Sequence, residues 1–172
     1  EPHEAIASFQ VADGLRIELA ACEPQVVDPV AIRFDERGRM WVVEMRDYPN
    51  GPAAGQPPLS RIKVLTDRDR DGFYETDQVF AENLLFATGL QPWRDGVIVT
   101  VAGNVVYMRD SNGDGTADEV ATWYSGFAEK NPQLRANHPT LSIDNQIYVA
   151  NGLRGGTVRN ARRVDEKPIE IS

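Results

Sequence analysis

The stretch TDRDRDGFYETD, residues 66–77, places three aspartates at alternate positions and follows them with a glycine and a glutamate. The stretch RDSNGDGTADE, residues 109–119, repeats the same spacing of acidic and glycine residues. Each copy lies between runs in which apolar and polar residues alternate, a pattern typical of a half-buried β-strand. A loop that recurs together with its flanking strands indicates that the chain is built from a repeated structural unit.

The segments around these loops define the unit. Residues 29–45, 88–102 and 138–152 each contain an apolar strand, a tight turn and a second apolar strand. In the first two copies a third strand, the acidic loop and a fourth strand follow, in residues 61–80 and 104–124. Four antiparallel strands in each repeat are typical of a β-propeller blade. We therefore predict an all-β propeller fold, in which residues 29–35 pair with 39–46 and residues 61–66 pair with 77–82.

The chain holds fewer blades than a closed propeller needs. We predict a lead-in strand near residues 14–20 within a tail of residues 1–27, blade one in 28–82 and blade two in 83–126. Residues 127–172 would form a partial blade three, with Ile169–Ile171 as its candidate fourth strand. Propellers close with about four to eight blades, so we expect an incomplete ring whose last blade presents an open apolar flank. The remaining blades, or another chain, would complete the ring.

The composition limits the classes of partner. The 172 residues are 41% hydrophobic and 26% charged, values typical of a soluble globular protein. A net charge of −8 argues against nucleic acid or an anionic membrane surface as a partner. The sequence contains no apolar run of about 18 residues, so we expect no membrane span. The single cysteine, Cys22, excludes an internal disulfide and a thiolate metal cluster.

The acidic loops have the spacing of a calcium-binding loop. Calcium binds six to eight hard oxygen atoms, and glycine allows the backbone to curl around the ion. Oxygen ligands are expected at positions 1, 3, 5, 7 and 9 of each loop, position 7 contributing its backbone carbonyl. These residues are Asp67, Asp69, Asp71, Phe73 and Glu75 in the first loop, and Asp110, Asn112, Asp114, Thr116 and Asp118 in the second. The alternative is a metal-free turn, since Asp, Asn and Gly also favour turns.

The position of the loops within the repeat predicts their role. In a meandering blade the first and third turns lie on one face of the disc, and the remaining connections lie on the other. Both acidic loops are third turns, so calcium there would brace the outer hairpins. Position 12 is Gln78 or Ala121, and the closing glutamate of an EF-hand is therefore absent. We expect a structural role for these loops, away from any site on the opposite face.

The opposite face is predicted to carry a polar rim. Residues that end second strands or begin first strands meet there, and binding residues commonly lie on loops held by a rigid scaffold. The expected binding residues are Glu44, Arg46, Asp47, Tyr48, Asn137 and Asn151, and Arg135, His138 and Arg154 lie in the same connections. His138 is a candidate general base, because a neutral imidazole accepts a hydroxyl proton. The alternatives are a surface ion pair for Arg46 and Asp47, a turn cap for Asn137, and a structural role for His138.

Several motifs together resemble one known family. They are WVVEMRDYPNGP (41–52), RIKVLTDRDRDGFYET (61–76), LLFATGLQPW (84–93), AEKNPQLRANHPT (128–140) and DNQIYVANGLRGG (144–156). They resemble the N-terminal propeller of the large haem-binding CxxCH proteins of planctomycetes and their relatives, which carry the label membrane-bound dehydrogenase. That family is in turn distantly similar to soluble quinoprotein sugar dehydrogenases, which use pyrroloquinoline quinone and calcium. In those enzymes a histidine lies at a comparable rim, and by residue count Arg135 falls closer to its position than His138 does.

The resemblance implies a function that the residues alone do not. It implies an exported or periplasmic propeller oxidoreductase that oxidises a sugar or polyol and passes electrons to a haem domain. No CxxCH motif occurs in this sequence, so that haem would lie outside the chain. The alternative function is a non-catalytic propeller that binds carbohydrate or protein. The same fold supports both functions, and the choice depends on the rim.

Overall fold

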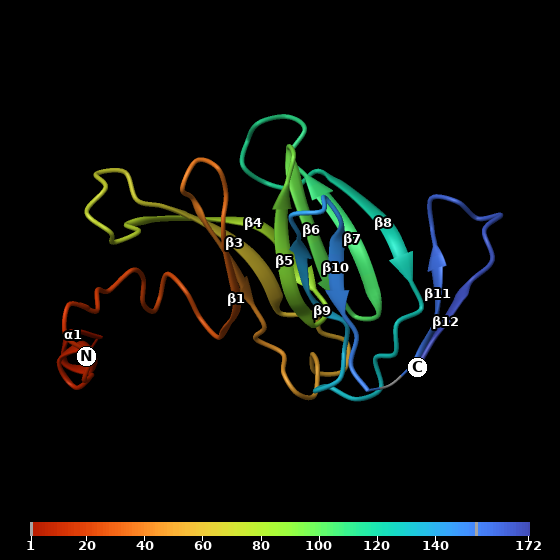
Figure 1. Cartoon of the computed structure of the whole chain (residues 1–172), viewed down its shortest axis with the longest axis horizontal. Helices are drawn as coiled ribbons and strands as arrows, with labels where there is room; N and C mark the ends of the chain where they lie inside the picture. The colour runs from red at the N-terminus through yellow and green to blue at the C-terminus, as the bar shows by residue number, and fades with distance from the viewer. Residues whose placement is uncertain (1, 154) are drawn as a thin grey trace.

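The regular secondary structure of the chain is almost entirely β-strand, which confirms the predicted all-β class (Figure 1). The structure is a computed structural model that describes residues 2–153 and 155–172, without the side chain of His3. Within these ranges the elements are α1 (Pro2–Ala7), β1 (Pro29–Phe34), β2 (Met40–Glu44), β3 (Ser60–Thr66), β4 (Thr76–Leu84), β5 (Ala87–Trp93), β6 (Gly96–Val101), β7 (Asn104–Arg109), β8 (Glu119–Ser125), β9 (Asn137–Leu141), β10 (Ile147–Ala150), β11 (Gly156–Asn160) and β12 (Ile169–Ile171). No helix in the described part of the chain is both long and apolar enough to cross a membrane.

The first sheet has the order β1-β2-β3-β4, and we call it blade one. Neighbouring strands are antiparallel, and Trp41 of β2 pairs with Arg33 of β1 and with Val64 of β3. Strands β3 and β4 pair from Thr66 and Thr76 outward. The expected pairings of residues 29–35 with 39–46 and of 61–66 with 77–82 are therefore both present. Every residue of β2 is buried, because both faces of blade one are covered at this strand.

The second sheet contains β5 to β8 in meander order, and we call these four strands blade two. Its inner strand β5 contacts β1 and β2 of blade one, and β5 and β6 contact β9 of the third unit. Strands β9 and β10 form a separate two-stranded antiparallel sheet. Blade two is thus packed between blade one and the β9–β10 hairpin.

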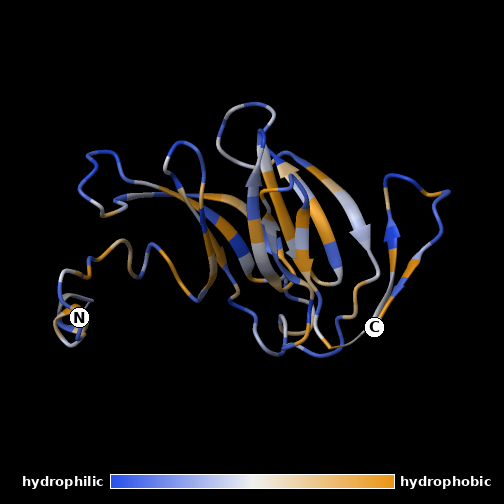
Figure 2. Ribbon diagram, viewed as in Figure 1, coloured by the Kyte–Doolittle hydropathy of each residue, from blue (hydrophilic) through white to orange (hydrophobic). Residues whose placement is uncertain are grey.

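The main core lies between the blades. Trp41 and Phe80 of blade one meet edge to face, with ring centroids 4.8 Å apart. They pack in one cluster with Val99 and Met108 of blade two, and all four side chains are buried. Burying one such side chain contributes about 2 kcal/mol to folding. Figure 2 shows hydrophobic residues along these strands and mainly hydrophilic residues in the loops at their ends.

The outer face of blade one is only partly covered. Val30, Ile32 and Phe34 alternate along β1, and 43%, 44% and 60% of their surfaces are exposed. Ala21 and Val26 of the N-terminal segment instead pack against the central strands β2 and β3, at Met40, Val42 and Leu65. This exposed side of β1 is an apolar flank on the first blade, whereas the sequence prediction concerned the last blade.

Two sequence predictions differ from the structure. Residues 14–20 form no strand, because they pair with no sheet edge, and Ala20 O instead accepts one hydrogen bond from Tyr74 N of the first acidic loop (2.8 Å). The strand Ile169–Ile171 is not a fourth strand beside β9 and β10. It pairs with β11, and β11 pairs with the outer edge of β8, where it satisfies backbone groups that would otherwise stay unpaired.

Candidate functional site

The two acidic loops occupy equivalent places in blades one and two. Residues 67–75 connect β3 to β4, and residues 110–118 connect β7 to β8. In each antiparallel meander they lie at the same end as the β1–β2 and β5–β6 turns. The connections of residues 45–59 and 126–136 lie at the other end, which is the lower side of the blades in Figure 1.

The first acidic loop is closed by its own carboxylates. Asp67 Oδ1 accepts the backbone N–H of Arg70 (2.6 Å), and Asp67 Oδ2 accepts that of Gly72 (2.9 Å). The N–H of Arg68 donates to Glu75 Oε1 (2.8 Å). These bonds tie the start of the loop to its middle and its end, so the backbone is curled before any ion is considered.

The second loop repeats this arrangement bond for bond. Asp110 Oδ1 accepts the N–H of Gly113 (2.6 Å), and Asp110 Oδ2 accepts that of Gly115 (2.7 Å). The N–H of Ser111 donates to Asp118 Oδ1 (2.7 Å). Positions 3 and 5 also match, in the bonds Asp71 N to Asp69 Oδ1, Phe73 N to Asp71 Oδ1, Asp114 N to Asn112 Oδ1 and Thr116 N to Asp114 Oδ1.

The backbone conformation of the two loops also agrees. Gly72 and Gly115 at position 6 have φ of 98° and 88°, in the region that glycine adopts without steric cost. Position 4 has a positive φ in both loops, 64° at Arg70 and 83° at Gly113. Arg70 therefore holds a left-handed conformation that is costly for a residue with a Cβ atom.

The donor set fits a hard cation in the first loop. Ligand oxygens of Asp67, Asp69 and Asp71 lie within 4.8 Å of one another. The backbone bonds described above use one oxygen of Asp69 and one of Asp71. Asn112 stands in the second loop where Asp69 stands in the first, so the second loop offers an amide oxygen in place of one carboxylate. Oxygen-only ligands favour calcium or magnesium over transition metals.

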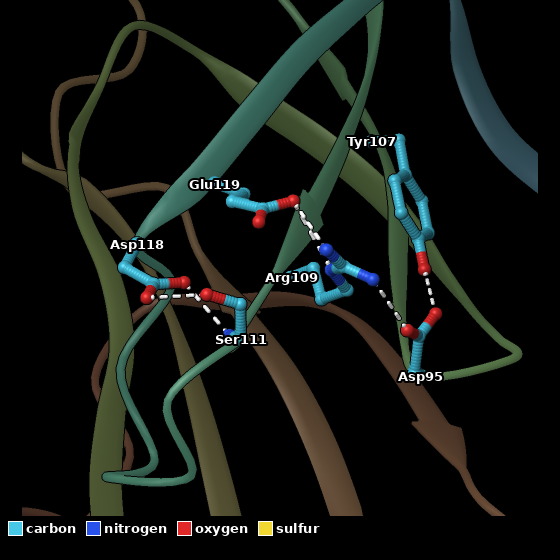
Figure 3. Close-up of polar contacts among 6 residues, drawn as sticks. All are labelled: Asp95, Tyr107, Arg109, Ser111, Asp118 and Glu119. Atoms are coloured by element: carbon cyan, nitrogen blue, oxygen red, sulfur yellow. Dashed lines mark hydrogen bonds and ion pairs between the residues drawn. The ribbon is translucent and has the colours of Figure 1, made fainter.

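A polar network braces the second loop from outside (Figure 3). Arg109, which precedes the first ligand position, donates to Asp95 Oδ2 (2.9 Å) and to Glu119 Oε2 (2.6 Å). Tyr107 donates its hydroxyl to Asp95 Oδ1 (2.5 Å). The hydroxyl of Ser111 donates to Asp118 Oδ2 (2.8 Å). The network thus fixes both ends of the loop to the β5–β6 turn and to each other.

These contacts move the pKa values of the groups involved. Hydrogen bonds from Tyr107 and Arg109 lower the pKa of Asp95 to about 2. Burial and the bond to Asp95 raise the pKa of Tyr107 to about 12. The backbone and hydroxyl bonds from Ser111 lower the pKa of Asp118. All three groups therefore keep their hydrogen-bonding state across neutral pH.

The opposite end of the blades holds the predicted rim residues, and two of them face inward. Glu44 is fully buried, where it accepts the N–H of Val27 (2.9 Å) and pairs with Arg61. Asp47 is also buried, and it accepts the hydroxyl of Ser60 (2.6 Å). Glu44 is thus a structural carboxylate in this chain, in place of the expected ligand contact.

Arg135 lies at the centre of the rim. Its guanidinium stacks on the Phe86 ring, 3.6 Å from the centroid, and only 7% of the residue is exposed. Its Nε forms no hydrogen bond within the described residues, and one guanidinium nitrogen donates to Pro132 O at 3.4 Å. Burial lowers the pKa of Arg135, while the charges of Glu129 and Asp47 and the nearby Tyr48 oppose that shift. Arg135, Asp47 and Tyr48 therefore come together, as the sequence predicted.

The remaining predicted rim residues surround this group without forming one site. Arg46 is exposed and lines a shallow hollow with Asp28 and Tyr48. Asn137 donates to Arg135 O (3.0 Å), and the half-buried Asn151 donates to Gly152 O (3.0 Å). His138 is exposed. Arg154 lies outside the described residues.

Three rim positions share a backbone feature that the sequence did not predict. Asp28, Phe86 and His138 have φ of 49°, 49° and 50°. They stand immediately before or at the start of β1, β5 and β9, and the register shifts nearby in each hairpin. Non-glycine residues in this conformation are uncommon and strained, and such strain concentrates at functional sites. The sequence carries no local signal for this conformation, because Phe86 precedes alanine and a residue before proline ordinarily favours extended backbone.

The sequence also did not predict the partners of these groups. Arg61 is directly opposite Glu44 in the β2–β3 register, so a cross-strand charge pair was the available signal. Each first turn of a unit carries an aspartate that accepts a hydrogen bond from an aromatic side chain. These bonds run from Trp41 Nε1 to Asp35, from the Tyr107 hydroxyl to Asp95 and from the Tyr148 hydroxyl to Asp144.

Comparison with known proteins gives one match. A family model described as a domain of unknown function (DUF7133) matches residues 1–172. No curated protein and no solved structure matches the chain.

Proposed function

The chain belongs to the DUF7133 family of domains of unknown function, and from that premise we propose that it is the N-terminal part of a calcium-binding β-propeller. The bond-for-bond agreement of the two acidic loops carries this proposal. Two stretches that differ at most positions hold the same positive-φ residues and the same hydrogen bonds from backbone N–H groups to side-chain oxygens. A shared ligand would explain why both loops keep this conformation although their sequences differ. Turn propensity alone explains this agreement less well.

Calcium would neutralise the crowded carboxylates and hold each outer hairpin closed. Asp67, Asp69, Asp71, Glu75 and the Phe73 carbonyl would hold it in the first loop. Asp110, Asn112, Asp114, Asp118 and the Thr116 carbonyl would hold it in the second. The backbone amides that now bond the carboxylates fix their direction, so little ordering remains to oppose binding.

Calorimetric titration of the metal-free chain with calcium tests this proposal. We expect two sites, one of which is lost in Asp71→Ala and the other in Asp114→Ala. The exposed Asp165→Asn is the matched control, because it removes a carboxylate away from both loops. A chain that takes up no calcium and whose melting temperature ignores a chelator would refute the proposal.

We also propose that the rim binds a sugar or polyol, in an exported or periplasmic dehydrogenase-like protein whose haem domain and further blades lie outside this chain. The supporting observation is Arg135, which is buried on Phe86 beside Asp47 with an unbonded Nε. Three residues away, exposed His138 is free to approach a ligand hydroxyl. His138 would accept that hydroxyl proton while a hydride leaves the same carbon.

A quinone cofactor, which the resemblance implies, would supply the hydride acceptor for this chemistry. Its carboxylates need cationic partners, and Arg46 and Arg135 are two cations at this rim that would serve. Dye reduction by the longer protein, loaded with pyrroloquinoline quinone and calcium and offered a panel of aldoses, tests the activity. Loss of turnover in His138→Asn with retained sugar binding would support the base. Sugar binding without turnover in the unchanged protein would favour the non-catalytic function.

A further inference from the structure

Gln78 connects the two acidic loops through strand β4. It lies three positions after Glu75, the last candidate ligand of the first loop. Its side-chain Nε2 donates to the backbone carbonyl of Asp114 in the second loop, at 2.9 Å. The carboxylate of Asp114 is a candidate ligand, whereas its carbonyl is not at a ligand position. The bond therefore leaves the proposed metal ligands of the second loop available.

The second loop contacts β4 at two further points. The N–H of Ala117 donates to the carbonyl of Phe80 (2.7 Å), which forms a backbone bridge between the blades. Gly115 has no room for a Cβ atom, because the side chain of Gln78 fills that space. Ala117 also packs against the core cluster that contains Phe80. The position of the second loop thus depends on where residues 78–80 lie.

The same strand is fixed at its start by the first loop. Thr76 pairs with Thr66 across the loop, and the Thr76 hydroxyl donates to Thr66 O (3.1 Å). Asp77 forms an ion pair with the buried Lys63. Residues 76–78 are continuous β-strand, so movement of the first loop end reaches Gln78 without an intervening turn.

We propose that Gln78 is a positioning residue that couples the two loops, so that order in one loop favours order in the other. This inference rests on the proposed calcium binding, and it makes that binding cooperative. Coupling between two binding sites is reciprocal, so each ion raises the affinity for the other by the same factor. The net contribution of one hydrogen bond corresponds to a factor of about two to twelve, and this range bounds the coupling.

A double-mutant cycle with calcium tests the coupling. Asp71→Ala disables the first loop, and the calcium affinity of the second loop is then measured by calorimetry with and without Gln78→Met. Methionine has a similar length but donates no hydrogen bond. We expect Asp71→Ala to weaken the second site about threefold more when Gln78 is present than in the Gln78→Met background. The cycle cancels the long-range loss of one negative charge, which is common to both backgrounds.

A readout independent of affinity accompanies the cycle. Hydrogen exchange of the Ala117 amide should be faster in Gln78→Met than in the unchanged chain. Asp71→Ala should also make this exchange faster when Gln78 is present, but should add nothing in the Gln78→Met background. Gln133→Ala, at the other end of the blades, is the matched control and should leave this amide unchanged. Equal effects of Asp71→Ala in both backgrounds, with calcium still bound at the second loop, would overturn the coupling and leave the proposed function intact. A chain that binds no calcium would overturn both.

Discussion

The two acidic loops share a conformation but differ in what they are attached to. The first packs beside the N-terminal segment, where Tyr74 N bonds Ala20 O (2.8 Å) and the side chain of Gln25 bonds Tyr74 O (2.8 Å). The second packs on β4 of the neighbouring blade, through Gln78 and Ala117. The loop sequence therefore determines the curled backbone, whereas the segment that each loop packs against determines which parts of the fold the loop holds together.

The differences inside the loops show which positions set the conformation. Position 4 is Arg70 in one loop and Gly113 in the other, yet both have a positive φ. Positions 1 and 6 are Asp and Gly in both loops, and the two side-chain bonds from position 1 are the same. The aspartate at position 1 thus forces the left-handed residue, and glycine at position 4 only makes that residue less costly.

Removal of the first aspartate should have the largest effect, and the effect should differ between loops. Asp110→Ala deprives two backbone N–H groups of their acceptor. It also weakens the contacts of the second loop with Gln78 and Phe80 of β4. We expect it to lower the free energy of unfolding by about 3 kcal/mol, and Asp67→Ala by about 2 kcal/mol. Urea denaturation in the presence of a chelator measures both. Equal losses would mean that the contact between blades adds nothing to the second loop.

Exchange of the residues at position 4 should have the next largest effect. Gly113→Ala places a Cβ atom in a left-handed residue with open space around it, and should cost about 1 kcal/mol. Arg70→Gly relieves the same strain and should stabilise the first loop by up to about 1 kcal/mol, less the entropy that glycine adds to the unfolded chain. Thermal unfolding of the two variants gives the comparison. A stabilising Gly113→Ala would contradict the shared conformation.

Removal of one hydrogen bond from the network of Tyr107, Asp95 and Arg109 should have a smaller effect, which is measured as a change in the pKa of Asp95. Thr66 stands in the first loop where Arg109 stands in the second, so the first loop has no such brace. The pKa of Asp95, lowered to about 2, means that its contribution to stability is present above about pH 3.8 and is lost as the pH falls toward 2. Tyr107→Phe should move this pKa upward and shift acid unfolding to higher pH. An NMR titration that finds Asp95 unchanged in the variant would argue against the assigned hydrogen bond.

The smallest effect should come from making the first loop chemically like the second. Asp69→Asn reproduces Asn112, keeps an oxygen at position 3 and removes one charge. We expect calcium affinity at the first site to fall by about tenfold or less, with little change in stability without metal. The reverse change, Asn112→Asp, should raise affinity at the second site. The prediction requires calcium affinity to fall in Asp69→Asn and to rise in Asn112→Asp.

The strands and the acidic loops were predictable because their signals are local. Alternation located β1, β3 and β6, the repeated order of the unit located the strands between them, and the Asp and Gly spacing located both loops. Residues 14–20 alternate as well, but a strand needs a neighbour, and none is adjacent in the described chain. The position of Ile169–Ile171 depends on whether β11 pairs with β10 or with β8, which local residues do not encode.

The rim was predicted less completely, because the contacts of its side chains depend on which of them are buried. Sequence position brought Asp47, Tyr48 and Arg135 to one end of the blades, and the structure agrees. It did not reveal that Glu44 faces Arg61 inside the sheet, or that Phe86 lies under Arg135. These facts depend on which face of a strand end is covered by the next unit.

The left-handed residues at the starts of β1, β5 and β9 have a consequence for protein engineering. Asp28, Phe86 and His138 are an acid, an aromatic ring and an imidazole on one common backbone geometry. Asp28 and His138 are exposed, so a combinatorial library at these two positions would vary the surface chemistry without disturbing the core, whereas Phe86 is buried under Arg135. Asparagine and glycine, which tolerate this geometry best, are the natural starting substitutions.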